Sequence, residues 1–223
     1  MSIAMVKHPD KSRIVHLLFA KYGQNFSEEL GIDLSHPGPS ALFRWFCATL
    51  LSSTRISSGL AMRGAKALTH KGWTTPQKMV EATWEERTRT LNEAGYARYD
   101  ESTSTKLETD SKLMLEKYHG DLRRLREAAE RDPARERELL EEFKGIGDVG
   151  ADIFFREIQL AWDELFPFAD RKALSVAETL GLGSTAQALA ELTPRDRFPT
   201  LLSALVRCGL AKEEEALLEE ARG

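Results

Sequence analysis

The chain has 223 residues, of which 42% are hydrophobic and 30% charged, and its formal net charge is −4. This is the composition of an ordinary globular protein with one large domain or two small lobes, and no apolar run approaches the ~20 residues of a membrane span. The N-terminal residues show no apolar signal-peptide core, so we expect a cytoplasmic protein. Only Cys47 and Cys208 are present, which excludes a disulfide framework and a four-cysteine cluster, and the five histidines show no metal-ligand spacing.

Hydrophobic spacing predicts an all-helical protein, and no segment shows sustained strand alternation. The expected helices span residues 10–22, 39–51, 57–71, 84–93, 99–118, 121–130, 134–143, 149–163, 171–180, 185–191, 195–208 and 211–221, and a further helix begins at Thr75 and Pro76. Thr75 followed by Pro76 is typical of a helix start, because threonine caps the first turn and proline fits it. Thr193 and Pro194 repeat this pattern.

The segment FKGIGDVGAD at residues 143–152 predicts a tight turn between two helices. Residues 134–143 are strong helix formers, and residues 149–162 again have apolar side chains at helical spacing. Gly145 and Gly147 between them permit positive φ and leave no Cβ in the way. N–H groups of such a turn, with those that open the next helix, can converge on an anion such as a DNA phosphate. The alternative interpretation is a plain corner whose glycines allow close packing.

The wider pattern LEEFKGIGDVGADI at residues 140–153 resembles the helix-hairpin-helix of the endonuclease III superfamily of DNA glycosylases. Two upstream segments are also similar to this family. FCATLLSST at residues 46–54 resembles its early helix and the DNA-facing loop that follows. AGYAR at residues 94–98 resembles a turn of its adenine-mismatch branch. The resemblance covers residues 40–182, and the hairpin is its most specific part.

The resemblance implies an all-α fold of two helical lobes with a DNA-binding cleft. Residues 40–148 would form the central lobe with most of the hairpin, and residues 1–39 and 149–223 would form the second. Many members carry a four-cysteine iron–sulfur cluster, which two cysteines cannot form, so we expect no cofactor and no metal. The implied partner is double-stranded DNA with a damaged or mispaired base. We expect a monomer, associated with the nucleoid if the source is bacterial.

Residues 168–170, Phe-Ala-Asp, resemble the loop that ends in the family's catalytic aspartate. On local evidence Asp170 is an N-cap, because aspartate is among the preferred residues before a helix. The two roles are compatible, since a cap holds the carboxylate in place. An ionised carboxylate could stabilise the oxocarbenium-like sugar that forms as a base departs, or activate water. Asp163 and Glu164 are alternative carboxylates, because the segment from Gly147 to Asp170 is longer than in endonuclease III.

Val149 stands two residues beyond the second hairpin glycine, where bifunctional relatives place a nucleophilic lysine. Valine cannot form a Schiff base, so the resemblance implies a monofunctional glycosylase without lysine-dependent strand cleavage. Lys144 and Lys172 are the nearest lysines. Either could act as an unusual amine nucleophile, but we expect Lys144 to neutralise a phosphate.

A larger set of residues is assigned to the DNA backbone, on the hairpin and after Asp170. These residues are Lys144, Gly145, Ile146, Gly147, Val149, Gly150, Arg171 and Lys172. The net charge of −4 counts against DNA binding, because basic patches usually dominate phosphate affinity. The acidic residues are concentrated in 127–142 and 211–223, however, so a local basic face is compatible with the sequence.

Thr54, Arg55 and Tyr96 are the candidates for the base pocket and for filling the gap that an extruded base leaves. Family members commonly place a glutamine near the position of Thr54. Threonine is shorter, and Arg55 could substitute for it, although both could equally form an ordinary helix end. Among the aromatic residues Tyr96 is the preferred stacking partner for an extruded base, ahead of Tyr99 and Trp84, whereas Trp45 is expected in the core.

The sequence therefore predicts a base-excision-repair DNA glycosylase that hydrolyses the N-glycosidic bond of a damaged or mispaired base. One alternative is a non-catalytic protein of the same fold that binds damaged DNA or abasic sites. A second alternative is a helical interaction scaffold that does not bind DNA.

Overall fold

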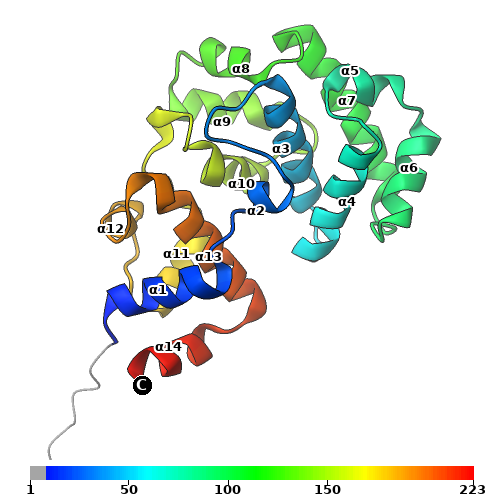
Figure 1. Cartoon of the computed structure of the whole chain (residues 1–223). Helices are drawn as coiled ribbons and strands as arrows, with labels where there is room; N and C mark the ends of the chain where they lie inside the picture. Colours follow the sequence, from blue (N-terminus) through cyan, green and yellow to red (C-terminus); the bar gives the residue numbers. More distant parts are fainter. Residues whose placement is uncertain (1–8) are drawn as a thin grey trace, which may run out of the picture. The chain divides into compact units, whose positions relative to one another are not determined.

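The computed structural model describes residues 9–223, and these residues contain helices and no strand (Figure 1). The all-α prediction is confirmed. The N-terminal stretch, on which the expected lack of a signal peptide largely rests, lies mostly outside the described residues. The elements are α1 (Lys11–Tyr22), α2 (Phe26–Glu29), α3 (Pro39–Ser52), α4 (Ser58–His70), α5 (Pro76–Glu81), α6 (Trp84–Glu93), α7 (Asp100–Tyr118), α8 (Leu122–Ala128), α9 (Pro133–Glu141), α10 (Asp148–Ile158), the 3₁₀ turn η1 (Asp163–Leu165), α11 (Arg171–Thr179), α12 (Ala186–Ala190), η2 (Arg195–Arg197), α13 (Phe198–Ala211) and α14 (Glu214–Arg222). No helix among residues 9–223 is long and apolar enough to cross a membrane.

Local capping explains where several helices begin. The Thr75 hydroxyl accepts the Lys78 N–H (3.3 Å), and Pro76 occupies the first turn of α5, as predicted. The prediction at Thr193 and Pro194 is wrong, because a 3₁₀ turn intervenes and α13 begins only at Phe198.

The helix predicted for residues 149–163 also ends earlier, at Ile158. The chain turns there so that the Trp162 ring packs edge-on against Phe154, with ring centroids 5.6 Å apart. Packing of Trp162 in the core thus ends the helix before the apolar residues at helical spacing run out.

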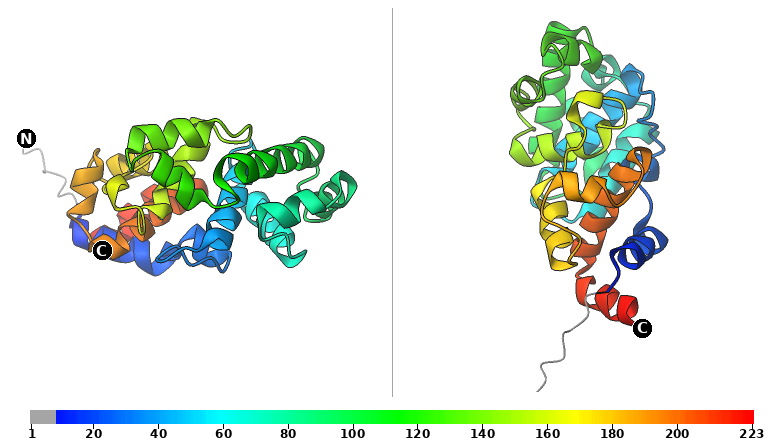
Figure 2. Two further views of the ribbon diagram at one scale, coloured as in Figure 1. Left: turned by 90° about the horizontal axis from the view of Figure 1, so that it is seen from above. Right: turned by 90° about the vertical axis from the view of Figure 1, so that its left-hand side faces the viewer.

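The described chain divides into two compact units. The middle unit is Phe26–Phe166, and the terminal unit is the chain up to Asn25 together with Pro167–Gly223. In the middle unit α3 is buried over residues 45–51, and it contacts α4, α8 and α10. In the terminal unit α13 contacts both α1 and α11, and α1 and α13 lie side by side in both views of Figure 2.

The unit boundaries differ from those that we predicted for the lobes. Residues 26–39 and 149–166 belong to the middle unit, because α10 packs against α3 and α9. The start of α2 is also bound there, since the Glu157 carboxylate accepts the N–H groups of Phe26 (2.8 Å) and Ser27 (2.9 Å). The whole hairpin therefore lies in the middle unit, whereas Asp170 lies in the terminal unit.

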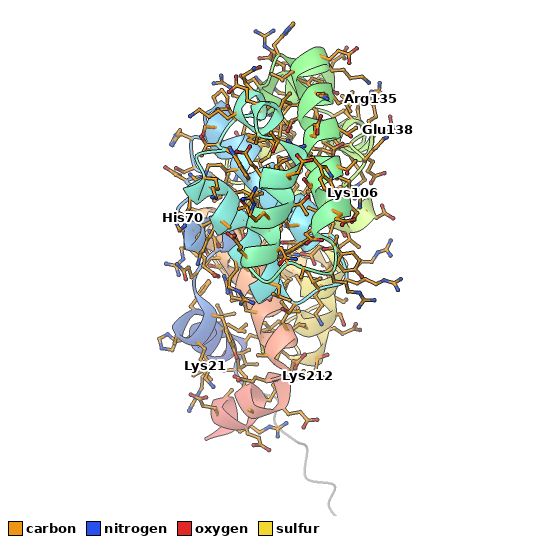
Figure 3. The ribbon with its side chains drawn as sticks, turned by 90° about the vertical axis from the view of Figure 1, so that its right-hand side faces the viewer. Lys21, His70, Lys106, Arg135, Glu138 and Lys212 are labelled. Carbon is orange, nitrogen blue, oxygen red and sulfur yellow. The ribbon has the colours of Figure 1, made fainter. Side chains whose placement is uncertain are left out.

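Most ion pairs are exposed, such as Arg135–Glu138 on α9 (2.6 Å; Figure 3), and contribute little to stability. A less exposed group joins α8, α9 and η1. Arg126 donates two hydrogen bonds of 2.6 Å to the two oxygens of Glu164, and Glu136 is buried beside them. Burial and the neighbouring Glu164 raise the pKa of Glu136 to about 9, and Arg126 contributes to a pKa of about 2 for Glu164.

This group predicts a stability that depends on pH. Between its ordinary pKa of 4.5 and about 9, Glu136 holds a proton in the folded protein that it has lost in the unfolded chain. Protonated Glu136 lets the folded protein keep its full free energy of unfolding below pH 4.5. This free energy falls as the pH rises toward about 9, because the unfolded chain then releases the proton more readily than the folded protein. Glu136→Gln keeps a neutral group, so its melting temperature at pH 9 should exceed that of the parent by about 3 °C or more. Thermal unfolding of both proteins at pH 5 and pH 9 would check this, and equal pH dependence would contradict it.

Candidate nucleic-acid interface

The predicted hairpin is present between α9 and α10. The Ile146 N–H donates to the Phe143 carbonyl (3.0 Å), which closes the turn, and Gly147 is the N-cap of α10. The expectation of positive φ is wrong, because Gly147 has φ −118° and Gly145 is not among the glycines with positive φ. Gly145 instead allows close packing, since a Cβ there would lie 2.4 Å from Cγ of Leu50. A Cβ on Gly147 would meet no atom within 4 Å, so this position is open.

The N–H groups of the hairpin fall into two sets. Those of Lys144 (2.8 Å) and Gly145 (3.1 Å) donate to the carboxylate of Asp110 on α7, and that of Ile146 is used in the turn. Those of residues 147–150 have no acceptor within the described part of the chain, and no side chain caps α10. The first turn of α10 is therefore the part of the hairpin that can bind an anion.

The charges around this helix start are mixed. Lys144 is exposed, and so is Asp148, a carboxylate on the first turn of α10. Arg137 on α9 offsets that negative charge, because it donates to Asp152 (2.6 Å) and lies 3.7 Å from the Asp148 carboxylate. Amide groups and the helix dipole, rather than a strongly basic patch, are the main attraction for an anion here.

Three sequence segments that we identified separately meet at the end of α3. Gly145 lies against Leu50, and a Cβ on Gly150 would lie 2.8 Å from Oγ of Ser53. The Tyr96 hydroxyl lies 3.0 Å from the Leu51 carbonyl and 2.5 Å from the Thr54 hydroxyl. The hairpin, the segment after α3 and the turn at Gly95 thus form one continuous region of the middle unit.

Tyr96 does not fit the stacking role that we predicted, because it is only 2% exposed. Gly95, at φ +87°, turns the chain, and the ring that follows lies in the core. The hydroxyl of Tyr96 instead fixes Thr54, which is half-buried. Arg55 next to it is exposed, and Trp45 lies in the core as expected.

Two aromatic side chains remain more accessible than Tyr96. Tyr99 is partly exposed, and the guanidinium of Arg98 lies 5.3 Å from the centre of its ring. Trp84 is exposed and donates its indole N–H to Thr105 (3.1 Å). Of the two, Tyr99 is the better candidate for the predicted stacking role, because it directly follows the segment AGYAR.

Asp170 occupies the N-cap of α11, as its local sequence predicts. Its Oδ1 accepts the N–H groups of Lys172 (3.0 Å) and Ala173 (3.2 Å), and the residue is 4% exposed. Arg171 and Lys172 are exposed, and Cε of Lys172 lies 3.3 Å from the position that a Cβ on Gly209 would take. The carboxylate is thus held in a fixed orientation in the terminal unit.

The alternative carboxylates differ from Asp170. Both oxygens of Glu164 are bound by Arg126, which gives this residue a structural role, and Asp163 is exposed on η1. Among residues 9–223 no group of three or more metal-binding side chains lies together. The two cysteines are both buried and lie in different units, so this donor set does not fit an iron–sulfur cluster.

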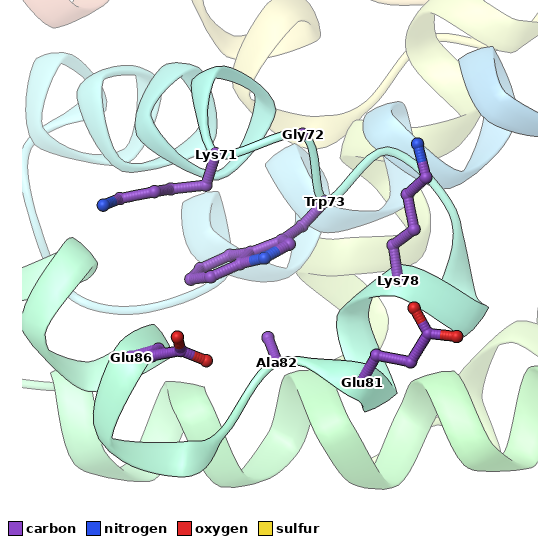
Figure 4. A pocket seen from close by; sticks show the side chains of 7 residues that line it. All are labelled: Lys71, Gly72, Trp73, Lys78, Glu81, Ala82 and Glu86. Carbon is purple, nitrogen blue, oxygen red and sulfur yellow. The ribbon is translucent and has the colours of Figure 1, made fainter.

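A pocket of about 380 Å³ lies elsewhere in the middle unit, between α4, α5 and α6 (Figure 4). It is lined by Lys71, Gly72, Trp73, Lys78, Glu81, Ala82 and Glu86. Its two lysines are matched by two glutamates, so it offers no net positive charge to a phosphate, and we assign it no part in the interface.

No protein-family model matches the sequence, and no curated protein matches it significantly. The structure is similar to two solved structures of endonuclease III with DNA, each at 16% sequence identity over 87% of this chain. One is a trapped endonuclease III–DNA covalent intermediate, an estranged-adenine complex (TM-score 0.52, 82% of that chain). The other is a non-covalent endonuclease III–DNA complex (TM-score 0.53, 81% of that chain). The chain therefore has the all-helical fold of endonuclease III.

Proposed function

We propose that this chain is a DNA glycosylase that binds duplex DNA and removes a damaged or mispaired base by hydrolysis, without cleaving the strand. The observation that carries the proposal is the uncapped first turn of α10, where Gly147, Asp148 and Val149 are exposed. Structural similarity to endonuclease III supports this assignment, because both similar structures contain DNA. The proposed partner is double-stranded DNA, bound by a monomer in the cytoplasm.

The hairpin is the proposed grip on the DNA backbone. The N–H groups of residues 147–150 would bind one phosphate, and exposed Lys144 would add a positive charge. Arg55 and the exposed Arg98 belong to segments that adjoin the hairpin through α3, so they would extend the contact. Backbone amides read no sequence, and the few cations predict modest affinity that falls as salt rises.

The proposed chemistry needs one carboxylate and one water. The bond between C1′ of the sugar and the base nitrogen breaks, the base leaves with the electron pair and takes up a proton, and water adds to C1′. Asp170 in its ionised form would stabilise the positive charge that develops on the sugar. Val149 supplies no amine where strand-cleaving relatives have lysine, so no Schiff base forms there.

A non-catalytic protein that binds damaged DNA or abasic sites is the second candidate. It is favoured by the burial of Asp170, whose carboxylate is already engaged in capping α11. Val149 at the lysine position is equally compatible with this function. Both candidates use the same hairpin, and base release on lesion-containing duplexes distinguishes them.

The open position of Gly147 gives a test of the grip. An aspartate there would find space and would cap α10 by accepting the N–H groups that are proposed for the phosphate. Gly147→Asp should therefore keep or raise the melting temperature while lowering affinity for a duplex with an abasic-site analogue about tenfold or more. Gly147→Ala, which adds neither cap nor charge, is the control. Unchanged affinity of folded Gly147→Asp, measured by fluorescence anisotropy, would exclude the hairpin as the grip.

The absence of lysine at position 149 gives a second test. Borohydride should trap no covalent adduct between the parent protein and a lesion-containing or abasic duplex, because no imine forms at Val149. Val149 is 61% exposed, so Val149→Lys should fold and provides a matched variant with an amine at this position. Efficient trapping by the parent protein would overturn the monofunctional assignment and direct attention to Lys144 or Lys172.

The carboxylate of Asp170 gives a third test. Asparagine caps a helix about as well as aspartate, so Asp170→Asn should preserve folding and DNA binding but lower base release about a hundredfold or more. Asp10, which caps α1 of the same unit by accepting the Ser12 N–H (3.0 Å), offers Asp10→Asn as a control for capping alone. Full activity of folded Asp170→Asn on a duplex that the parent processes would show that Asp170 is only a cap. No release by the parent from oxidised, alkylated, deaminated or mismatched duplexes would favour the non-catalytic function.

A further inference from the structure

The carboxylate of Asp110 is a feature of the hairpin that no sequence motif indicates. It projects from α7, is 0% exposed, and accepts the N–H groups of both Lys144 and Gly145. Gly145 packs on its other side against Leu50 of α3. The first half of the hairpin is thus held between a buried charge and the core.

A buried carboxylate is a costly way to hold a loop. Burial raises the pKa of Asp110, and the two backbone hydrogen bonds, with the charges of Lys106 and Lys144, offset only part of this effect. Burial of this carboxylate therefore costs free energy that its hydrogen bonds offset only in part. A negative charge beneath a loop that binds phosphate is also unfavourable for binding. Electrostatic attraction for a phosphate therefore does not account for an aspartate here.

We propose that Asp110 is a positioning residue, which holds the Lys144 and Gly145 amides so that the amides of residues 147–150 are directed at a DNA phosphate. The inference rests on the proposed function of the hairpin. A carboxylate suits the task because its two oxygens both accept and neither donates. An asparagine would present an NH₂ group to one of the two N–H donors, so one hydrogen bond would be lost.

The substitution Asp110→Asn separates positioning from simple electrostatics, because the two predict opposite signs. It removes a negative charge near the phosphate, so a purely electrostatic role predicts tighter DNA binding. A positioning role predicts weaker binding, about fivefold to tenfold for an abasic-analogue duplex at constant salt. Hydrogen exchange of the Lys144 and Gly145 amides should accelerate in the variant, while amides in the middle of α7 stay protected.

Glu157 provides a matched control in the same unit. It is also a buried carboxylate that accepts two backbone N–H groups, those of Phe26 and Ser27, at the end of α10 away from the hairpin. Glu157→Gln should lower the melting temperature as much as Asp110→Asn, or more, yet leave DNA affinity within about twofold.

Three results would be decisive. Weaker binding by folded Asp110→Asn, with faster exchange at Lys144 and Gly145 and unchanged binding by Glu157→Gln, supports the inference. Equal or tighter binding by Asp110→Asn, or equal weakening by Glu157→Gln, overturns it. If the parent protein binds no abasic-analogue duplex, the proposed function fails, and the exchange rates alone then decide whether Asp110 holds the hairpin.

Discussion

The close packing of the hairpin against α3 is the constraint on which the proposed DNA interface depends. A side chain larger than hydrogen at Gly145 would collide with Leu50, and one at Gly150 would approach Ser53. Residues 45–51 of α3 are buried in the core, so this part of the helix has no free space to move into. The hairpin therefore takes its position from the core, and the N–H groups at the start of α10 are directed by packing rather than by the loop itself.

The same packing holds in place the backbone amides through which a chain with a net charge of −4 can be proposed to bind DNA. Backbone amides and a helix dipole carry partial positive charge that does not appear in a count of basic residues. Few cations surround the hairpin, and Asp148 partly opposes them. Affinity would then depend on the geometry of a few amides, so a residue that fixes this geometry, such as Asp110, has more effect than its charge suggests.

Local sequence signals predicted several local features, but not the helix start expected at Thr193 and Pro194. The hairpin, the cap at Thr75 and the cap at Asp170 follow from residue types that act within three or four positions of themselves. The features that we missed involve distant residues. Tyr96 lies in the core, where its hydroxyl is hydrogen-bonded to Leu51 and Thr54, 45 and 42 residues earlier. Asp110 accepts hydrogen bonds from amides 34 and 35 residues later. The boundaries of the two units differ from the predicted lobes for the same reason, because they depend on the packing of α10 against α3 and α9.

Asp170 shows why a structural and a catalytic role need not be separated. Its Oδ1 is bound by two backbone N–H groups, which fixes the side chain before any substrate arrives. A carboxylate in a fixed position can stabilise a positive charge that develops on a sugar without first reorganising. A helix cap is therefore a suitable place for a catalytic carboxylate of this kind. The same geometry would survive in a protein that has lost the reaction, because the cap still stabilises α11, so only the chemistry of base release can distinguish the two.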